Sequence, residues 1–389
     1  MSKRVLTVFG TRPEAIKMAP VVLKLDSTPN LTSAVCVTAQ HREMLDPVMD
    51  LFDIAPDYDL DLMRPNQDLY DITASALLGM RDVLRDFQPD MVLVHGDTTT
   101  CFSASLAAYY ERVSIGHVEA GLRTGNLHAP FPEEGNRVLV DRLAQVLFAP
   151  TDSAKTNLLR EGVEPKRILV TGNTVIDALY EARNRLAQKP SLYWLQHFGE
   201  LLHKAIVEPK NRVILITGHR RENFGKGFTN LCLAIKKIAD RHPEWLLVYP
   251  VHLNPNVRKP VFNILAGLDN VHLIEPQDYL PFVWLMDKAD LILTDSGGVQ
   301  EEGPSLGKPV LVMRDVTERP EAVEAGTVAL VGTNTEKIVS MTESLLTDNV
   351  KYSRMAKASN PYGDGKASDR IIDALSGTTL AIQSKSNIR

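Results

Sequence analysis

The chain has 389 residues, of which 44% are hydrophobic and 23% charged, and its formal net charge at pH 7 is −5. The length favours two domains of roughly 150–200 residues each, and the composition is typical of a globular protein with a sizeable buried core. Because the net charge is negative and no long basic run occurs, nucleic acid is excluded as the expected main partner.

Short apolar runs alternate with helical patterns from one end of the chain to the other. In chain order the strand-like runs include 5–9, 34–38, 91–95, 113–118, 168–171, 213–217, 245–249, 271–274, 291–294 and 310–313. Near-continuous apolarity is typical of strands that are covered on both faces, and the intervening helices would supply the crossovers of a parallel sheet. The pattern predicts an α/β architecture.

Two sheets fit this strand series better than one. Polar, proline-containing segments at 189–191 and 208–211 separate the first group of strands from the second. We therefore predict an N-terminal α/β domain over 1–172 and a second α/β domain over 173–364. After the break at Asn360-Pro-Tyr-Gly-Asp-Gly, we predict a last helix within 365–378 and a disordered tail over 379–389.

The sequence favours a cytoplasmic protein without a metal or other cofactor. The first apolar run stops at Phe9, which is too short for a signal-peptide core, and no stretch approaches the ~18 apolar residues of a membrane span. Cys36, Cys101 and Cys232 are scattered, as expected of buried thiols in a reducing compartment. No His-Glu-x-x-His segment and no cysteine–histidine cluster occurs, so no metal site is predicted.

The segment Ser296-Gly-Gly298 follows a strand and opens a helical pattern. Glycine lets backbone N–H groups approach a ligand closely, and a helix N-terminus favours an anion, so this turn predicts a phosphate seat. It is not a Walker A loop, and no G-x-G-x-x-G segment occurs in the chain. Glu302 behind the turn is suited to a ribose diol, although Glu301 and Glu302 could simply complement the helix dipole.

Polar turns also follow the strands of the first half. Thr11, Pro13 and Glu14 have the spacing of a helix start, which leaves Arg12 and Lys17 to contact a phosphate or a uracil edge, or merely to solvate the helix.

Three carboxylates, Asp97, Glu119 and Glu133, lie at or near strand ends of the first half. The carboxyl ends of parallel strands share one crevice, so we expect the three to gather there and supply an acid–base pair. Each of them alone could be no more than a helix cap.

In the second half, His219 lies at a strand end beside Arg220 and Arg221, and it is predicted to face phosphate or to titrate. The loop after the glycine turn contains two arginines, and Arg319 is the better candidate of the two for contacting a pyrophosphate. A surface salt bridge is the alternative interpretation for Arg319.

With these residues assembled, the chain resembles the non-hydrolysing UDP-N-acetylglucosamine 2-epimerases along nearly its whole length. The matching blocks are FGTRPEAIKMAP (9–20), TAQHREMLD (38–46), LVHGDTTT (93–100), GHVEAGLRTG (116–125), TGNTVIDAL (171–179), TGHRRENFG (217–225), YPVHLNPNVR (249–258), TDSGGVQEE (294–302), LGKPVLVMRDVTERPEA (306–322) and NPYGDG (360–365). Gly135 and Gly303 depart from the pattern, since both stand where a helix former is expected and would each loosen a helix by up to ~1 kcal/mol.

The resemblance implies two Rossmann-like domains that face a central cleft, as in glycosyltransferase B enzymes, with a last helix returning to the first domain. It implies reversible conversion of UDP-N-acetylglucosamine to UDP-N-acetylmannosamine, through loss of UDP to a 2-acetamidoglucal and re-addition on the opposite face. It also implies a homodimer. The alternatives are a hydrolysing 2-epimerase, a UDP-sugar glycosyltransferase and a non-catalytic UDP-sugar sensor.

The family's site residues carry over by motif. They are Asp97, Glu119, Glu133, His219 and Lys17 for catalysis; Arg12, Lys17, His219, Phe282, Ser296, Gly297, Gly298, Glu302 and Arg319 for the UDP-sugar; and Gln40 and His41 for an allosteric contact.

Overall fold

The computed structural model describes residues 2–39, 42–208 and 210–377, which divide into two compact units. Unit 1 comprises Met1–Ala178 and the described residues from Tyr362 onward, and unit 2 comprises Leu179–Pro361. The sequence placed these boundaries at 172/173 and 364/365. Helix α7 (Thr174–Gln188) carries the chain out of unit 1. Within the described residues, no helix has the length and apolar character needed to cross a membrane.

Unit 1 is built on one parallel seven-stranded sheet in the order β3-β2-β1-β4-β5-β6-β7. Its strands are β1 (Lys3–Phe9), β2 (Leu31–Val37), β3 (Tyr58–Asp59), β4 (Met91–His95), β5 (Ser114–Val118), β6 (Val146–Ala149) and β7 (Ile168–Val170). The predicted parallel α/β sheet is confirmed. The apolar runs did not include β3 and β6, which have only two and four residues.

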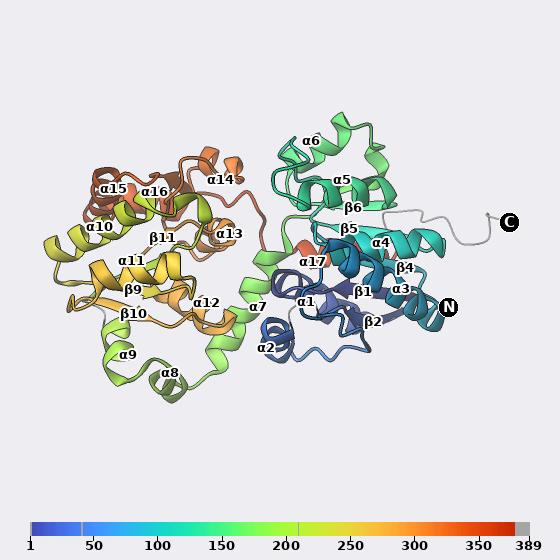
Figure 1. The fold of residues 1–389 in the computed structure, drawn as a ribbon, viewed down its shortest axis with the longest axis horizontal. Coiled ribbons are helices and arrows are strands. Elements are labelled where there is room, and N and C mark those ends of the chain that lie inside the picture. Colours follow the sequence, from blue (N-terminus) through green and yellow to red (C-terminus); the bar gives the residue numbers. More distant parts are fainter. Residues whose placement is uncertain (1, 40–41, 209, 378–389) are drawn as a thin grey trace. The chain divides into compact units, whose positions relative to one another are not determined.

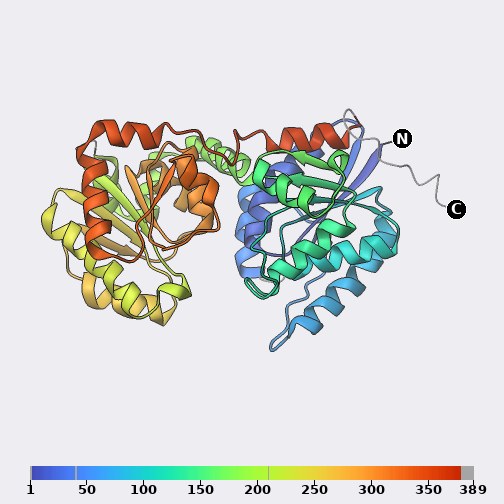
Figure 2. The same ribbon diagram turned by 90° about the horizontal axis from the view of Figure 1, so that it is seen from above.

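The helices of unit 1 form two contact groups: α1 packs against α2 and α17, whereas α4 packs against α3 and α5. Figure 2 shows helices on both sides of each sheet, which explains why the central strands are apolar throughout. The helices are α1 (Arg12–Asp26), α2 (Arg42–Phe52), α3 (Leu69–Phe87), α4 (Thr99–Tyr110), α5 (Glu133–Leu143), α6 (Asp152–Arg160), the 3₁₀ turn Pro165–Arg167 and α17 (Ala367–Leu375).

Unit 2 has a parallel six-stranded sheet in the order β10-β9-β8-β11-β12-β13 (Figure 1). Its strands are β8 (Arg212–Thr217), β9 (Trp245–Pro250), β10 (Val271–Ile274), β11 (Leu291–Thr294), β12 (Val310–Val312) and β13 (Val328–Leu330). The strand β13, three residues long, is the one that the apolar runs of this half did not include.

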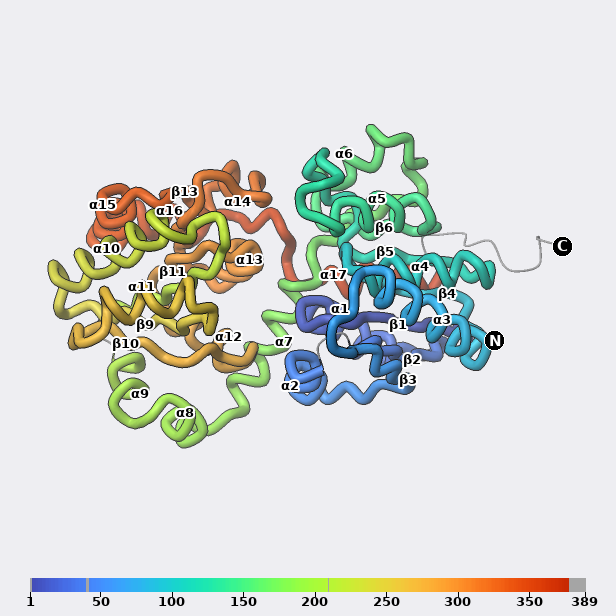
Figure 3. Tube along the Cα trace, in the orientation of Figure 1, coloured from blue at the N-terminus to red at the C-terminus, as the bar shows by residue number. Residues whose placement is uncertain are grey.

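The helices of unit 2 include a pair, α8 and α9, that pack against each other (Figure 3, green). They are α8 (Ser191–Phe198), α9 (Glu200–Val207), the 3₁₀ turn Arg221–Asn223, α10 (Lys226–Arg241), α11 (Pro255–Leu265), α12 (Tyr279–Lys288), α13 (Gly297–Ser305), α14 (Pro320–Glu324), α15 (Thr335–Thr347) and α16 (Asn349–Ala356).

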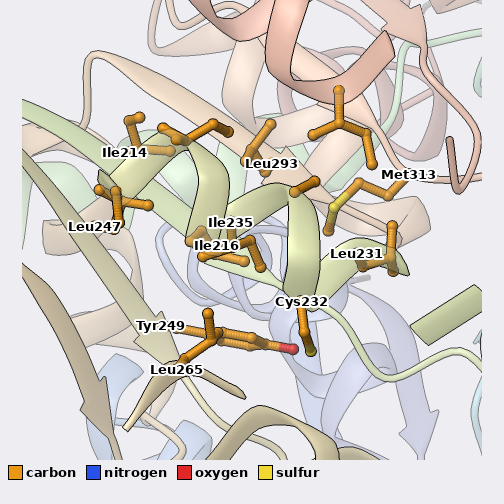
Figure 4. Close-up of a cluster of buried hydrophobic side chains, with 14 of the residues drawn as sticks. Ile214, Ile216, Leu231, Cys232, Ile235, Leu247, Tyr249, Leu265, Leu293 and Met313 are labelled. Atoms are coloured by element: carbon orange, nitrogen blue, oxygen red, sulfur yellow. The ribbon is translucent and has the colours of Figure 1, made fainter. Parts of the chain in front are cut away.

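The core of unit 2 reaches directly to the loop after β8. Leu231, Cys232 and Ile235 of α10 pack over strand residues such as Ile216 in this core (Figure 4). The ring of Tyr249 is 1% exposed, and its hydroxyl donates a 3.1 Å hydrogen bond to the carbonyl of Gly218. The core therefore fixes the first residue of that loop.

The last described helix, α17, belongs to unit 1. The backbone N–H groups of Ala367 and Ser368 donate to the Asp177 carboxylate at 3.2 and 2.8 Å. Lys24 Nζ of α1 lies 2.7 Å from Asp369 Oδ1, and Lys3 Nζ donates to the carbonyl of Leu375 at 3.0 Å. These contacts tie α17 to β1, to α1 and to the first residues of α7.

Two glycines within helices differ in the space around them. A Cβ at Gly303 in α13 would lie 2.7 Å from Val310 Cγ2 and 3.1 Å from Ile292 Cδ1, so the helix packs on β11 and β12 only with glycine there. Gly303 therefore has a packing role that the sequence did not indicate, in addition to its expected cost in helix propensity. A Cβ at Gly135 in α5 would meet no described atom within 4 Å.

We expect Gly135→Ala to raise the free energy of unfolding by about 0.5–1 kcal/mol, because alanine is the better helix former. As the matched control, Gly303→Ala should lower it by about 1–2 kcal/mol through overpacking. Urea unfolding of both variants checks this pair, and an equal response of the two would contradict it.

Candidate functional site

Each sheet has a point at which its strand order reverses, between β1 and β4 in unit 1 and between β8 and β11 in unit 2. Ligands of open α/β sheets bind at the carboxyl ends of the strands beside such a point. The polar turns selected from the sequence follow these four strands or their neighbours β5 and β12. We describe the two half-sites separately.

In unit 1, Glu14 joins the loop after β1 to the loop after β4. Its carboxylate accepts the N–H groups of Gly10 and Thr11 at 3.0 and 2.8 Å, and the Thr98 hydroxyl at 2.6 Å. Burial raises the pKa of Glu14 above its ordinary value, and hydrogen bonds from Thr98 and Gly10 oppose that shift. Glu14 thus completes the predicted capping box of α1 and is structural.

Lys17 of α1 and Glu119 after β5 form an ion pair through Glu119 Oε2. The same oxygen accepts Asn173 Nδ2 at 2.9 Å. Both side chains are largely buried, at 14% and 9% exposed, and Glu119 has a φ of +66°, in the left-handed region that non-glycine residues rarely adopt. Strained backbone of this kind clusters at functional sites.

Asp97, after β4, is paired with Arg137 Nη2 of α5. Asn136 Nδ2 of the same helix donates to the Asp97 carbonyl at 2.9 Å. Sequence reasoning missed both partners. They follow Glu133 at the i+3 and i+4 positions, so they share a helix face with it, and that spacing is the signal that could have found them.

The adjacent glutamates at the start of α5 have different roles. The Glu134 carboxylate is buried and accepts the N–H groups of Thr124 and Gly125 at 3.0 and 2.9 Å, so it anchors the loop before the helix. Glu133 is half-buried and makes no hydrogen bond or ion pair with the described residues. Of the two, Glu133 is therefore the one whose carboxylate is available for a ligand.

In unit 2, Asp295 organises the loop after β8. Its carboxylate is fully buried and accepts the N–H groups of His219 and Arg220, each at 2.9 Å, and Asn223 Nδ2 at 3.3 Å. The sequence shows Asp295 at a strand end but does not indicate this role. Asp295 therefore fixes the backbone positions from which the side chains of His219 and Arg220 extend.

The predicted phosphate seat is the N-terminus of α13, which begins at Gly297. Among the described residues, the N-cap Ser296 makes no side-chain capping hydrogen bond. Arg220 Nη2 lies 3.6 Å from the position that a Cβ at Gly297 would occupy, so a guanidinium flanks the first turn. Uncapped N–H groups, the helix dipole and a cation together suit an anion. Arg220 was considered in the sequence but not included among the site residues.

The two glutamates of α13 also differ. Glu301 is buried and paired with Arg319 Nε, so Arg319 belongs to a largely buried ion pair and not to a surface one. Glu302 accepts the Tyr279 hydroxyl at 2.7 Å. Tyr279 begins α12, and the half-buried Phe282 follows it one turn later. Tyr279 is a neighbour of the candidate ribose carboxylate that the sequence did not reveal.

The side chain of His219 is 41% exposed, so it is partly buried, and it stacks on His252 with ring centroids 5.5 Å apart. Partial burial lowers the pKa of His219 below its ordinary value, the charges of Arg220 and His252 lower it further, and Asp295 opposes them. His219 is therefore predominantly neutral at neutral pH.

This shift predicts a pH dependence of stability. Because the unfolded chain binds the His219 proton more readily than the folded one, the contribution of His219 is intact above about pH 6.5 and is lost as the pH falls from there toward the folded pKa. We expect the melting temperature of the parent to fall more than that of His219→Gln between pH 7.5 and 5.5. Parallel calorimetric scans check this, and identical pH curves would contradict it.

The structure gives few contacts for the remaining predicted site residues. Arg12 is the first residue of α1 and is half-buried. Gln40 and His41 lie outside the described residues, so their allosteric role stays a prediction. No group of three or more histidine, cysteine, aspartate or glutamate side chains among the described residues is arranged to hold a metal ion.

Comparisons with known proteins give one consistent result. The family model described as UDP-N-acetylglucosamine 2-epimerase matches residues 23–376. The UDP-N-acetylglucosamine 2-epimerase of Yersinia pestis is 61% identical over 96% of this chain and 98% of that protein. A probable UDP-N-acetylglucosamine 2-epimerase of Ralstonia nicotianae is 60% identical over the same shares. The crystal structure of the Neisseria meningitidis UDP-GlcNAc 2-epimerase bound to UDP-GlcNAc is similar with a TM-score of 0.86 and 55% identity, covering 96% of this chain and 99% of that one.

Proposed function

The chain belongs to the UDP-N-acetylglucosamine 2-epimerase family, and on that basis we propose that it interconverts UDP-N-acetylglucosamine and UDP-N-acetylmannosamine. One observation carries the proposal: each sheet has a polar turn at the reversal of its strand order, with carboxylates in unit 1 and with glycines and a guanidinium in unit 2. That combination suits a reaction in which a diphosphate leaves while a carbon-bound proton is exchanged.

In this proposal, unit 2 binds the nucleotide. The N–H groups at Gly297 and Gly298 and the guanidinium of Arg220 bind the diphosphate, which needs most stabilisation when it carries the charge of a leaving group. Glu302, oriented by Tyr279, accepts the ribose hydroxyls. Through its ion pair with Glu301, Arg319 stabilises helix α13, which carries Gly297, Gly298 and Glu302. Arg319 also adds positive charge near this helix.

Unit 1 supplies the proton chemistry. A carboxylate removes the proton from carbon 2 of the sugar, the electron pair of that bond forms the carbon 1–carbon 2 double bond, and the bond from carbon 1 to the UDP oxygen breaks with its pair on UDP. Re-addition reverses these steps with the proton delivered to the other face of carbon 2. Removal on one face and delivery on the other require two groups, for which Glu119, Asp97 and Glu133 are the candidates.

Proton NMR of the pure protein with UDP-N-acetylglucosamine in deuterated water tests the proposal. UDP-N-acetylmannosamine with deuterium at carbon 2 and the nucleotide still attached is the expected product. Free N-acetylmannosamine with UDP would instead indicate a hydrolysing enzyme. UDP binding without any turnover would leave a transferase or a sensor.

We further propose that the chain works as a cytoplasmic homodimer. The support is the resemblance to its family, and light scattering of the purified protein over a tenfold range of concentration tests the dimer. A mass of one 43.1 kDa chain at every concentration would contradict it.

A further inference from the structure

His95, the last residue of β4, is a buried side chain whose ring nitrogens make no hydrogen bond with the described residues. It is 3% exposed, and neither ring nitrogen has a hydrogen-bond partner among the described residues. Its Nε2 lies 3.7 Å from Glu119 Oε2, just beyond hydrogen-bond distance. Buried polar groups are nearly always paired, so an exception beside a candidate acid–base group calls for a reason.

His117 on the neighbouring strand β5 shows what a structural histidine looks like in this sheet. It is fully buried, its Nδ1 lies 2.6 Å from Asp141 Oδ1, and its Nε2 lies 2.7 Å from the carbonyl of Gly96. Both of its ring nitrogens therefore have a hydrogen-bond partner. No comparable partner fixes the tautomer of His95 within the described chain.

Two of the neighbours of Glu119 Oε2 are donors. Lys17 Nζ and Asn173 Nδ2 carry protons and have no lone pair to offer, so they favour the carboxylate over the carboxylic acid. A residue that takes up and returns a proton passes through both forms. The Nε2 of a neutral imidazole can donate to a carboxylate in one tautomer and accept from a carboxylic acid in the other.

We propose that His95 is a positioning residue for Glu119, one that closes on Oε2 and accepts a hydrogen bond from this carboxyl when the carboxyl is protonated. The proton from carbon 2 goes to Glu119 and not to the imidazole, whose own proton stays on Nδ1 throughout. This inference rests on the proposed epimerase activity and assigns a positioning residue to its proton-transfer step. The charged groups that face the pair are Glu14 and Lys17 of α1, while Asp97 in the next loop is paired with Arg137.

The test compares His95→Leu and His95→Gln with the parent, and uses His117→Leu as the structural control. We expect His95→Leu to lower kcat by about 10- to 100-fold, with KM within about twofold and a melting temperature no lower than that of the parent. Leucine replaces a buried polar group that has no hydrogen-bond partner among the described residues, so the melting temperature should not fall. If the role of His95 were purely structural, kcat would therefore not fall either. His117→Leu should instead lower the melting temperature, because it leaves Asp141 and the Gly96 carbonyl without their partner.

His95→Gln should restore most of the lost kcat, since its amide can either donate or accept at a similar position. In His95→Leu the acid limb of the kcat profile should move to lower pH, because the acceptor for the carboxylic acid is lost while the donors Lys17 Nζ and Asn173 Nδ2 remain beside Glu119 Oε2. Parent-like kcat and pH profile in His95→Leu would overturn the inference, and so would a loss of kcat that follows the melting temperature and is not restored by glutamine. Turnover by the parent is measured first, and its absence would overturn the proposed function and this inference with it.

Discussion

Replacing Glu119 with glutamine is expected to lower kcat for epimerisation by about 10²- to 10⁴-fold, the usual contribution of a general acid or base. The amide keeps the shape of the side chain and can still accept Asn173 Nδ2, but it cannot take up a proton. UDP affinity should stay within about twofold, because the proposed diphosphate and ribose contacts come from unit 2. The NMR assay in deuterated water measures the first quantity and calorimetric titration with UDP the second.

Glu111→Gln is the matched control for this substitution. Glu111 follows α4 in the same unit and pairs with Arg85, away from the carboxyl ends of the strands. Its replacement should change neither kcat nor UDP affinity, since exposed ion pairs contribute little. If Glu119→Gln kept kcat within about tenfold of the parent, Glu119 would not be a proton-transfer group, and Asp97 and Glu133 would become the pair to test.

Asp295→Asn is expected to have the largest combined effect on stability and binding. Asp295 is an acceptor for three donors in a fully buried position, whereas asparagine places an amide donor against at least one of the backbone N–H groups of His219 and Arg220. We expect the free energy of unfolding to fall by about 2–4 kcal/mol, the range for buried donors that lose a charged acceptor. UDP affinity should fall at least tenfold, because the loop that positions Arg220 beside Gly297 is no longer held.

Asp290→Asn separates these two effects. The Asp290 carboxylate accepts the Val213 N–H at 2.8 Å and pairs with Arg212, so it also joins β8 to β11, but at the amino ends of the strands. Its replacement should lower stability, by about 1 kcal/mol, and leave UDP affinity unchanged. Urea unfolding and calorimetric titration are made on both variants. Unchanged UDP affinity in Asp295→Asn would show that the loop does not contribute to the nucleotide site.

The strand-end turns could be predicted because they depend on local rules. A strand of buried residues followed by Ser-Gly-Gly and a helix start is visible within ten residues, and so is the capping box at Thr11 and Glu14. The parallel sheets follow from the apolar runs in the same way. The choice of one glutamate from each adjacent pair was compatible with the geometry: Glu134 and Glu301 are committed to the fold, while the roles of Glu133 and Glu302 stay predictions.

The partners of these residues could not be predicted, because they depend on which strands and helices become neighbours. Arg137 reaches Asp97 across 40 positions, and Asp295 accepts the N–H of His219 across 76. Nothing in the sequence near His95 shows that its ring would be buried without a hydrogen-bond partner in the part of the chain that the structure describes, or that Arg319 would pair with Glu301. The packing role of Gly303 could not be predicted for the same reason, since the side chains that exclude a Cβ come from β11 and β12.

The return of the chain at α17 has a consequence for biosynthesis. Unit 1 is assembled from residues up to 178 and from residues after 361, so a ribosome must synthesise all of unit 2 before it delivers the helix that contains Ile371, Ile372 and Leu375. Until then the face of α1 that α17 covers and the carboxylate of Asp177 are without these partners. Unit 2, which is continuous in sequence, can complete its core first. The N-terminal half of the nascent protein should thus be the last to become resistant to protease, against the usual order of synthesis.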